Sequence, residues 1–105
     1  MPDSQTSETI RQAIRERRQL RLVLTTGEGH IVEPHQYGWG VDGGLTLWAW
    51  SVSATGTETS ATTTSWMICP LGEMRVARIL DETFPGPRPG YRRANKQIPK
   101  ILEQL

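Results

Sequence analysis

The chain has 105 residues and a mass of 11.8 kDa, the size of one domain with a single modest core. Its 12 Lys and Arg against 11 Asp and Glu give a net charge of +1, which excludes a polybasic tail protein and a strongly acidic one. A single cysteine excludes an internal disulfide framework, and the apolar runs are far shorter than the roughly 20 residues of a membrane helix. Because the polar first residues lack a signal-peptide pattern, we expect a soluble cytoplasmic protein.

The first expected element is an amphipathic helix that follows a disordered segment, residues 1–8. Ser7 is a suitable N-cap, and the helical period continues to about Gln19. Two neighbouring stripes follow this period. The apolar stripe contains Ile10, Ala13 and Ile14, and the basic stripe contains Arg11, Arg15 and Arg18.

A period of two then predicts about five short strands. They cover residues 20–25, 30–37, 45–53, 66–69 and 74–80. Residues 27–29 and the Asp42-Gly43 pair supply turns. Residues 55–65 are rich in Ser and Thr, so we expect a flexible loop there.

The last segment, residues 85–105, reads as a Pro-rich basic tail that ends in a short helix. The apolar stripe of this helix contains Ile98, Ile101, Leu102 and Leu105. Short strands between two helices predict one domain of mostly β class, a small barrel with an N-terminal amphipathic helix and a short C-terminal helix.

Three motifs suggest chemistry but lack the context for it. Gly38, Gly40 and Gly43 match the dinucleotide fingerprint, but a strand rather than a helix is expected to follow, which favours a glycine-rich turn. His30 and His35 fall on opposite faces of an ideal strand, and Cys69 lies near neither of them in sequence. We therefore expect no cofactor, no metal and no catalytic residue.

The net charge conceals a segregation, since residues 31–82 are acidic in total and residues 83–105 are basic. Around Tyr91 this tail carries a cluster of cations. Arginine beside an aromatic ring is typical of phosphate contact with base stacking, although a basic tail can also be merely solvated. The candidate residues for binding an anion are Arg11, Arg15, Arg18, His30, Tyr91, Arg92, Arg93 and Lys96.

Trp48 and Trp50 share one face of a predicted strand. The simplest interpretation is core packing, and the functional one is an interface with a protein partner or a second copy. The hypotheses are thus the binding of an anionic ligand, such as single-stranded nucleic acid, and protein association through the tryptophan face.

Four segments together carry a family resemblance: IRQAIRERRQLRL at residues 10–22, IVEPHQYG at residues 31–38, LTLWAW at residues 45–50 and LDETFPGPRPGY at residues 80–91. With these segments the chain resembles WYL domains, in particular the short stand-alone ones of bacteria. The resemblance implies an Sm-like β-barrel of about five strands that acts as a regulatory or ligand-sensing module, in transcription regulation or phage defence. It also implies a basic pocket that accepts single-stranded DNA or another nucleic-acid ligand, without catalysis.

The positions of that pocket are altered in this chain. The tripeptide that gives the family its name aligns with residues 45–47, of which only Leu47 matches. His30 stands where the family has an Arg, and Pro70 and Glu73 stand at two further basic positions. Since these groups cannot contact phosphate as Arg does, the resemblance predicts an altered or lost pocket. The basic residues of the helix and tail would then supply the anion-binding surface.

Overall fold

The computed structural model describes residues 4–55, 65–93 and 96–105. Within these ranges, one helix precedes six strands, and a single 3₁₀ turn, η1, interrupts the strands. The elements are α1 (Ser4–Glu16), β1 (Arg18–Leu24), β2 (Gly29–Trp39), β3 (Leu45–Thr55), β4 (Ser65–Pro70), η1 (Leu71–Glu73), β5 (Met74–Thr83) and β6 (Lys100–Gln104).

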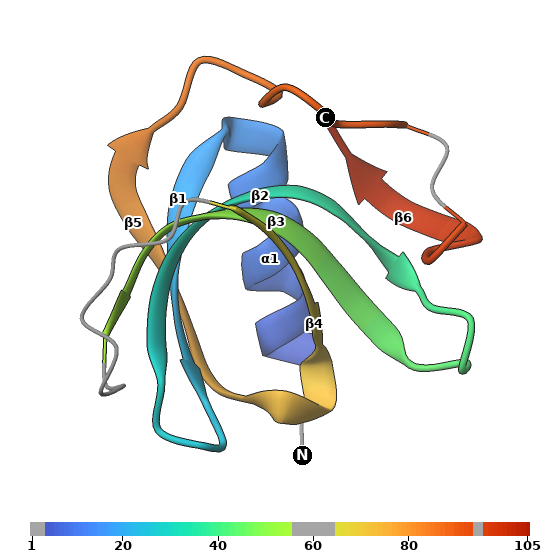
Figure 1. Cartoon of the computed structure of the whole chain (residues 1–105), viewed down its shortest axis with the longest axis horizontal. Coiled ribbons are helices and arrows are strands. Elements are labelled where there is room, and N and C mark those ends of the chain that lie inside the picture. The colour runs from blue at the N-terminus through green and yellow to red at the C-terminus, as the bar shows by residue number, and fades with distance from the viewer. Residues whose placement is uncertain (1–3, 56–64, 94–95) are drawn as a thin grey trace.

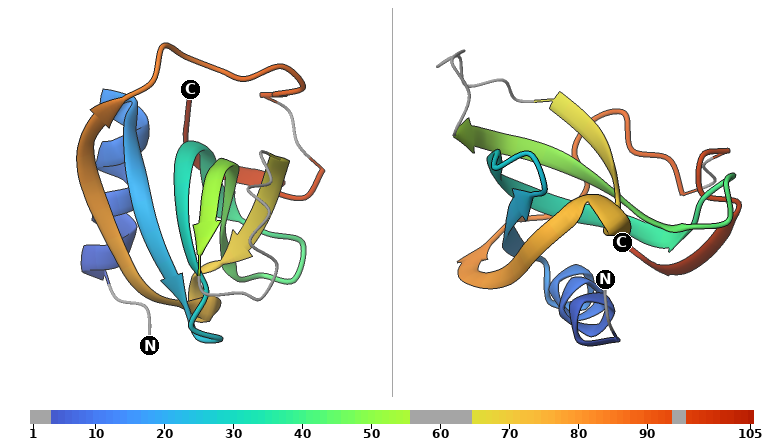
Figure 2. Two further views of the ribbon diagram at one scale, coloured as in Figure 1. Left: turned by 60° about the vertical axis from the view of Figure 1, so that its left-hand side comes forward. Right: turned by 90° about the horizontal axis from the view of Figure 1, so that it is seen from below.

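All six strands belong to one antiparallel sheet in the order β4-β3-β2-β1-β5, and β6 pairs with the second half of β2. The sheet curves around α1, as Figures 1 and 2 show. The two edge strands, β4 and β5, are joined by η1. The expectation of a mostly β chain is confirmed, whereas the sheet is open and does not close into the expected barrel. Within the described residues, no helix combines the length and the apolarity that crossing a membrane would demand.

The core lies between α1 and the sheet. The helix contributes the predicted apolar stripe, whose side chains Ile10, Ala13 and Ile14 are buried. Alternate strand residues face this stripe, including Leu20 and Leu22 of β1, both fully buried. Because β1 and β5 alternate with a period of two, the side chains between these core positions point to the opposite, outer face of the sheet.

The helix begins at Ser4, so residues 4–8 are helical rather than disordered, and Ser7 lies inside the helix instead of capping it. The helix ends at Glu16, earlier than Gln19, because Arg17 adopts the left-handed conformation with φ of 54°. This residue turns the chain directly into β1. The expected loop at residues 55–65 falls largely outside the described residues; of it the structure describes Thr55 in β3 and Ser65 in β4.

The expected C-terminal helix is wrong, because residues 100–104 form strand β6. Pairing with β2 supplies hydrogen bonds to this segment that a helix of one or two turns would lack. Gly38 of β2 allows the approach of β6, since a Cβ at this position would lie 2.8 Å from Cα of Ile101. Ile98, the first residue of the predicted apolar stripe, lies just before β6 and is completely buried.

Candidate nucleic-acid interface

Two arginines lie directly opposite each other on the outer face of the sheet. Arg21 of β1 is the cross-strand partner of Arg78 of β5, and both side chains are exposed. The next outward pair is Val23 with Val76, and the Val76 side chain is 48% exposed. This part of the outer face is therefore both basic and apolar.

The two guanidinium groups have no acidic partner, as neither Arg21 nor Arg78 forms an ion pair with any residue that the structure describes. Like charges directly opposite each other in an antiparallel pair destabilise a sheet. A bound anion would remove this repulsion, because a guanidinium makes two parallel hydrogen bonds with a phosphate.

Aromatic rings occupy the other half of the outer face. Trp50 of β3 is the cross-strand partner of Glu33 in β2 and of Trp66 in β4. The Trp66 ring centroid lies 5.3 Å from that of Trp50 and 4.5 Å from that of Trp48. Trp50 and Trp66 are half-buried. Tryptophan faces of this kind are the surfaces on which single-stranded bases stack.

Residues 84–91 cross this aromatic cluster. Arg88 reaches down to Glu33, with Nε 2.7 Å from one carboxylate oxygen and the second contact at 3.0 Å. The Glu33 side chain is only 3% exposed, so this carboxylate is paired inside the protein. The Arg88 guanidinium also lies 5.6 Å from the centroid of the Trp50 ring, in a cation–π arrangement.

His35 is fully buried beneath the same segment. Its Nδ1 lies 2.7 Å from the backbone carbonyl of Glu33, which can only accept, so Nδ1 carries the proton. Its Nε2 accepts a hydrogen bond of 3.0 Å from the backbone N–H of Arg88. Burial lowers the pKa of His35, against the smaller opposing effect of Glu33. His35 is therefore a neutral imidazole with both nitrogens engaged.

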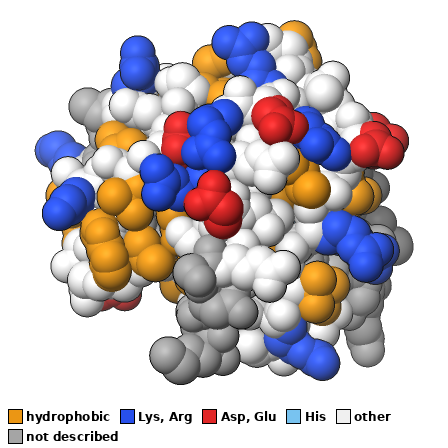
Figure 3. Space-filling model, turned by 180° about the vertical axis from the view of Figure 1, so that it is seen from behind, with side chains coloured by type: hydrophobic (Ala, Val, Ile, Leu, Met, Phe, Trp, Pro, Cys, Tyr) orange, Lys and Arg blue, Asp and Glu red, His pale blue; other side chains and the backbone are white. Residues whose placement is uncertain are grey.

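The three arginines predicted to form a basic stripe on the helix all pair with acids, and Arg18 is the first residue of β1 rather than part of α1. Arg11 and Arg15 both contact Glu103 of β6, at 3.3 and 3.1 Å. Arg18 contacts Glu16 and Asp81 at 3.1 Å each. The three arginines named as anion-binding candidates thus tie α1 to β6 and the start of β1 to β5. Figure 3 shows basic and acidic side chains interspersed on one face of the molecule rather than gathered by sign.

The basic tail residues are attached to β2 through the backbone of Arg92 and Arg93. Arg92, Arg93 and Lys96 are exposed. The backbone carbonyls of Arg92 and Arg93 accept hydrogen bonds from the buried amide of Gln36, which fixes the tail to β2. Tyr91 is half-buried among the aromatic rings, and its hydroxyl lies 3.2 Å from Oε1 of Gln104.

The tryptophan face has less exposed surface for a partner than the sequence suggests. Trp48 is 9% exposed and packs against Trp66 and Tyr91. Trp50 lies partly under Arg88. Residues 84–91 of the same chain therefore already cover much of this face.

The remaining titratable candidates belong to the core or its margin. His30 is half-buried, and its Nδ1 has no hydrogen-bond partner among the described residues. Burial, with a smaller effect of Glu73, raises the pKa of the Cys69 thiol to about 11, so this group is protonated at neutral pH. In the described part of the chain, no three His, Cys, Asp or Glu side chains gather closely enough to hold a metal ion.

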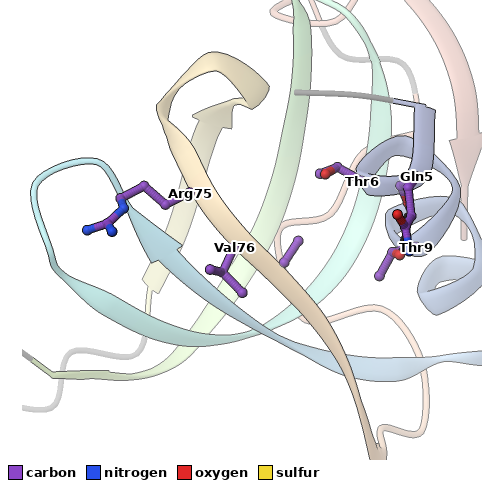
Figure 4. A pocket seen from close by; sticks show the side chains of 6 residues that line it. Gln5, Thr6, Thr9, Arg75 and Val76 are labelled. Atoms are coloured by element: carbon purple, nitrogen blue, oxygen red, sulfur yellow. Dashed lines mark hydrogen bonds between the residues drawn. The ribbon is translucent and has the colours of Figure 1, made fainter. Parts of the chain in front are cut away.

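A shallow pocket of about 220 Å³ lies between the start of α1 and β5. Its lining is mostly hydroxyl, amide and small apolar groups, and Figure 4 shows the Arg75 side chain pointing away from Thr6 and Thr9. The lining therefore offers no convergent charged groups to a ligand.

The glycine motif ends in a hairpin, since Gly43 has φ of +85° and strand β3 follows it. The βα context of a dinucleotide site is not present at this motif. In comparisons with known proteins, no family, no curated protein and no solved structure matches the chain.

Sequence reasoning missed Arg21, Arg78, Glu33, Arg88 and Trp66 as members of one face. The alternation in each strand places Arg21 and Arg78 outward, and this signal was readable. Their position directly opposite each other depends on the register between β1 and β5, and the sequence of one strand does not determine this register.

Proposed function

We propose that this chain is a non-enzymatic regulatory module of WYL-like character that binds single-stranded nucleic acid on the outer face of its sheet. The observation that supports this most strongly is the exposed pair of Arg21 and Arg78, which lie directly opposite each other without an acidic partner among the described residues. Such a pair favours an anionic ligand, because the ligand relieves a repulsion that the fold otherwise carries.

Single-stranded nucleic acid fits this face better than a small anion does. Arg21 and Arg78 offer bidentate contacts to the phosphate backbone. Ile31 is the cross-strand partner of Arg21 on β2, and Glu33, two residues further along β2, is the cross-strand partner of Trp50 on β3. Apolar surface therefore lies beside the cations, and the aromatic surface lies further along the same sheet. Bases stack on aromatic rings while phosphates contact basic side chains, and both kinds of surface occur here on one face.

Fluorescence anisotropy with a labelled oligo-dT of about 12 nucleotides tests the proposal. Two comparisons accompany it: duplex DNA of the same length as an alternative ligand, and inorganic phosphate as a competitor of the bound oligo-dT. We expect the single strand to bind more tightly than the duplex, and millimolar phosphate to compete poorly. No binding of the single strand at low salt would contradict the proposal, and full displacement by phosphate would reduce the site to one for a simple anion.

A second candidate function is association with another copy through strand β4. This strand is an edge of the sheet, and Ile68, the cross-strand partner of Trp48, is 42% exposed. Exposed apolar edge strands favour pairing with another chain. Light scattering over a range of concentrations tests this. A dimer that Ile68→Lys dissociates would support it, and a monomer at all concentrations would contradict it.

A further inference from the structure

Residues 84–91 lie over the aromatic half of the proposed binding face. Phe84 is buried and stacks on His35, with ring centroids 5.5 Å apart. The indole N–H of Trp66 donates a hydrogen bond of 3.2 Å to the carbonyl of Pro89. In Figure 1 this segment is the part of the chain that leads from β5 towards β6 across one end of the molecule.

The segment approaches Trp66 closely at one glycine. Gly90 has φ of +94°, and a Cβ at this position would lie 2.9 Å from Nε1 of Trp66. Both the backbone conformation and the contact therefore require glycine. The covering segment is thus fitted to the tryptophan that it shields.

We propose that residues 84–91 form a proton-sensitive cover over a base-stacking site made by Trp48, Trp50 and Trp66, and that protonation of His35 opens it. This inference rests on the proposed function, because it concerns the regulation of the same face. The geometry that carries it is the hydrogen bond from the Arg88 amide to Nε2 of His35.

A proton on Nε2 would turn this acceptor into a donor that faces another donor. The imidazole has no alternative, since its Nδ1–H is already bonded to the Glu33 carbonyl. The amide of Arg88 would then lose its only acceptor in this contact. Breaking the contact leaves a part-buried N–H group unpaired, and movement of the segment away from His35 lets water bind this group.

The charged and titratable groups that face His35 are Glu33 from β2 and Arg88 and Tyr91 from the cover; Trp66 from β4 and Phe84 add only apolar rings. The Glu33 carboxylate attracts an imidazolium, but both of its oxygens already bind Arg88. The Arg88 guanidinium repels the imidazolium. Burial in this apolar surrounding is the largest influence, and it disfavours the charged ring.

The direction of the pH effect follows from linkage. His35 has a lower pKa in the closed form than its ordinary value of 6.5, so the closed form binds the proton more weakly than the open form. The contribution of His35 to the stability of the closed form is therefore fully present above about pH 6.5 and decreases as the pH falls below it. A single proton changes the ratio of open to closed molecules by up to about tenfold per pH unit.

The experiment follows the indole N–H of Trp66 and the amide N–H of Arg88 by NMR between pH 7.5 and 5, with exchange corrected for its intrinsic pH dependence. We expect both protons to lose protection with one midpoint below about 6.5, while the core amides of β1 keep theirs. The variant His35→Gln keeps an acceptor but does not titrate, so its cover stays closed throughout. Equal pH dependence in wild type and His35→Gln would overturn the proposal, as would constant protection in the wild type.

Two further measurements keep the test decisive if His35→Gln does not fold. The first is the ring titration of His35 in the wild-type protein, whose midpoint must match that of the Arg88 amide; different midpoints would overturn the proposal. The second is Gly90→Ala, which should open the cover at pH 7.5, with Gly72→Ala as a control because a Cβ there contacts nothing within 4 Å.

Binding of labelled oligo-dT then separates the two proposals. An increase in affinity with Gly90→Ala, and not with Gly72→Ala, supports a covered stacking site. Unchanged affinity in a variant whose Trp66 N–H shows an open cover would overturn it. If the wild-type protein binds no oligonucleotide at any pH, the proposed function fails, and the protection of the two N–H groups still decides whether His35 controls the cover.

Discussion

Glu33 and Arg88 lie 55 residues apart in the chain and form a two-point ion pair, and the Arg88 guanidinium lies over the Trp50 ring. The carboxylate is buried, whereas the Arg88 side chain is 41% exposed. Because Glu33 is buried, water cannot solvate its carboxylate when Arg88 is removed. Loss of Arg88 therefore leaves an unpaired charge inside the protein.

Arg88→Ala should therefore lower the free energy of unfolding by about 2 kcal/mol. This is the typical loss when a charged group loses its hydrogen-bond partner, and here the partner is half-exposed. Urea denaturation measures the change. Arg92→Ala is the matched control, since this neighbouring side chain is exposed and should leave stability within about 0.5 kcal/mol. The double variant Arg88→Ala/Glu33→Gln should lose less stability than the sum of the losses in Arg88→Ala and Glu33→Gln. A loss equal to that sum would show that the two side chains are not coupled.

Arg78→Gln should not destabilise the protein. Removing one of two like charges directly opposite each other in a sheet is expected to raise the free energy of unfolding by about 0.2–1 kcal/mol. The same variant should weaken the binding of oligo-dT. Urea denaturation and anisotropy on one preparation give both values, and a parallel loss of stability and binding would mean that Arg78 serves the fold.

Gly38→Ala should disturb the pairing of β6 with β2. A Cβ at this position meets the backbone of β6, which cannot give way as a flexible side chain does. We expect a loss of about 1–3 kcal/mol, as for overpacking. Hydrogen exchange should show lost protection in β6 while β1 and β5 remain protected, and uniform protection would contradict this account of Gly38.

The Cys69 thiol should react slowly with a disulfide reagent such as DTNB at pH 7.5. Burial raises its pKa to about 11, so the thiolate fraction is small and the sulfur is shielded. The rate should rise to that of an ordinary exposed thiol in urea. Rapid reaction of the folded protein would contradict the buried position.

Local sequence pattern predicts much of this fold. The stripe of Ile10, Ala13 and Ile14 is the buried side of α1, and the alternation around Leu20 and Leu22 gives β1 its two faces. These signals are reliable because each depends only on the period of a single element. Strand ends differ by at most three residues from those expected, as at the end of β5.

The C-terminal strand shows where local pattern fails. Ile98, Ile101 and Leu102 have helical spacing, but the segment pairs with β2 at a site that Gly38 leaves open. The same limit applies to the charges, because Glu103 meets Arg11 and Arg15 only through this pairing. The opposition of Arg21 and Arg78 likewise depends on register, a property of two strands together.

The most direct test of the account is the salt dependence of oligo-dT binding by the wild type, by Arg21→Gln/Arg78→Gln and by Arg75→Gln. Arg75 is an exposed arginine of β5 at the register shift between β1 and β5, where the register pairs it with no residue of β1, so it is the matched control for the opposed pair. Each phosphate contact on a single strand contributes about 0.7 to the slope of log K against log salt. We predict that the double variant loses about 1.4 from the slope and binds more weakly at low salt, while Arg75→Gln matches the wild type. Equal slopes and affinities for all three proteins would contradict the assignment of the outer face as the binding surface.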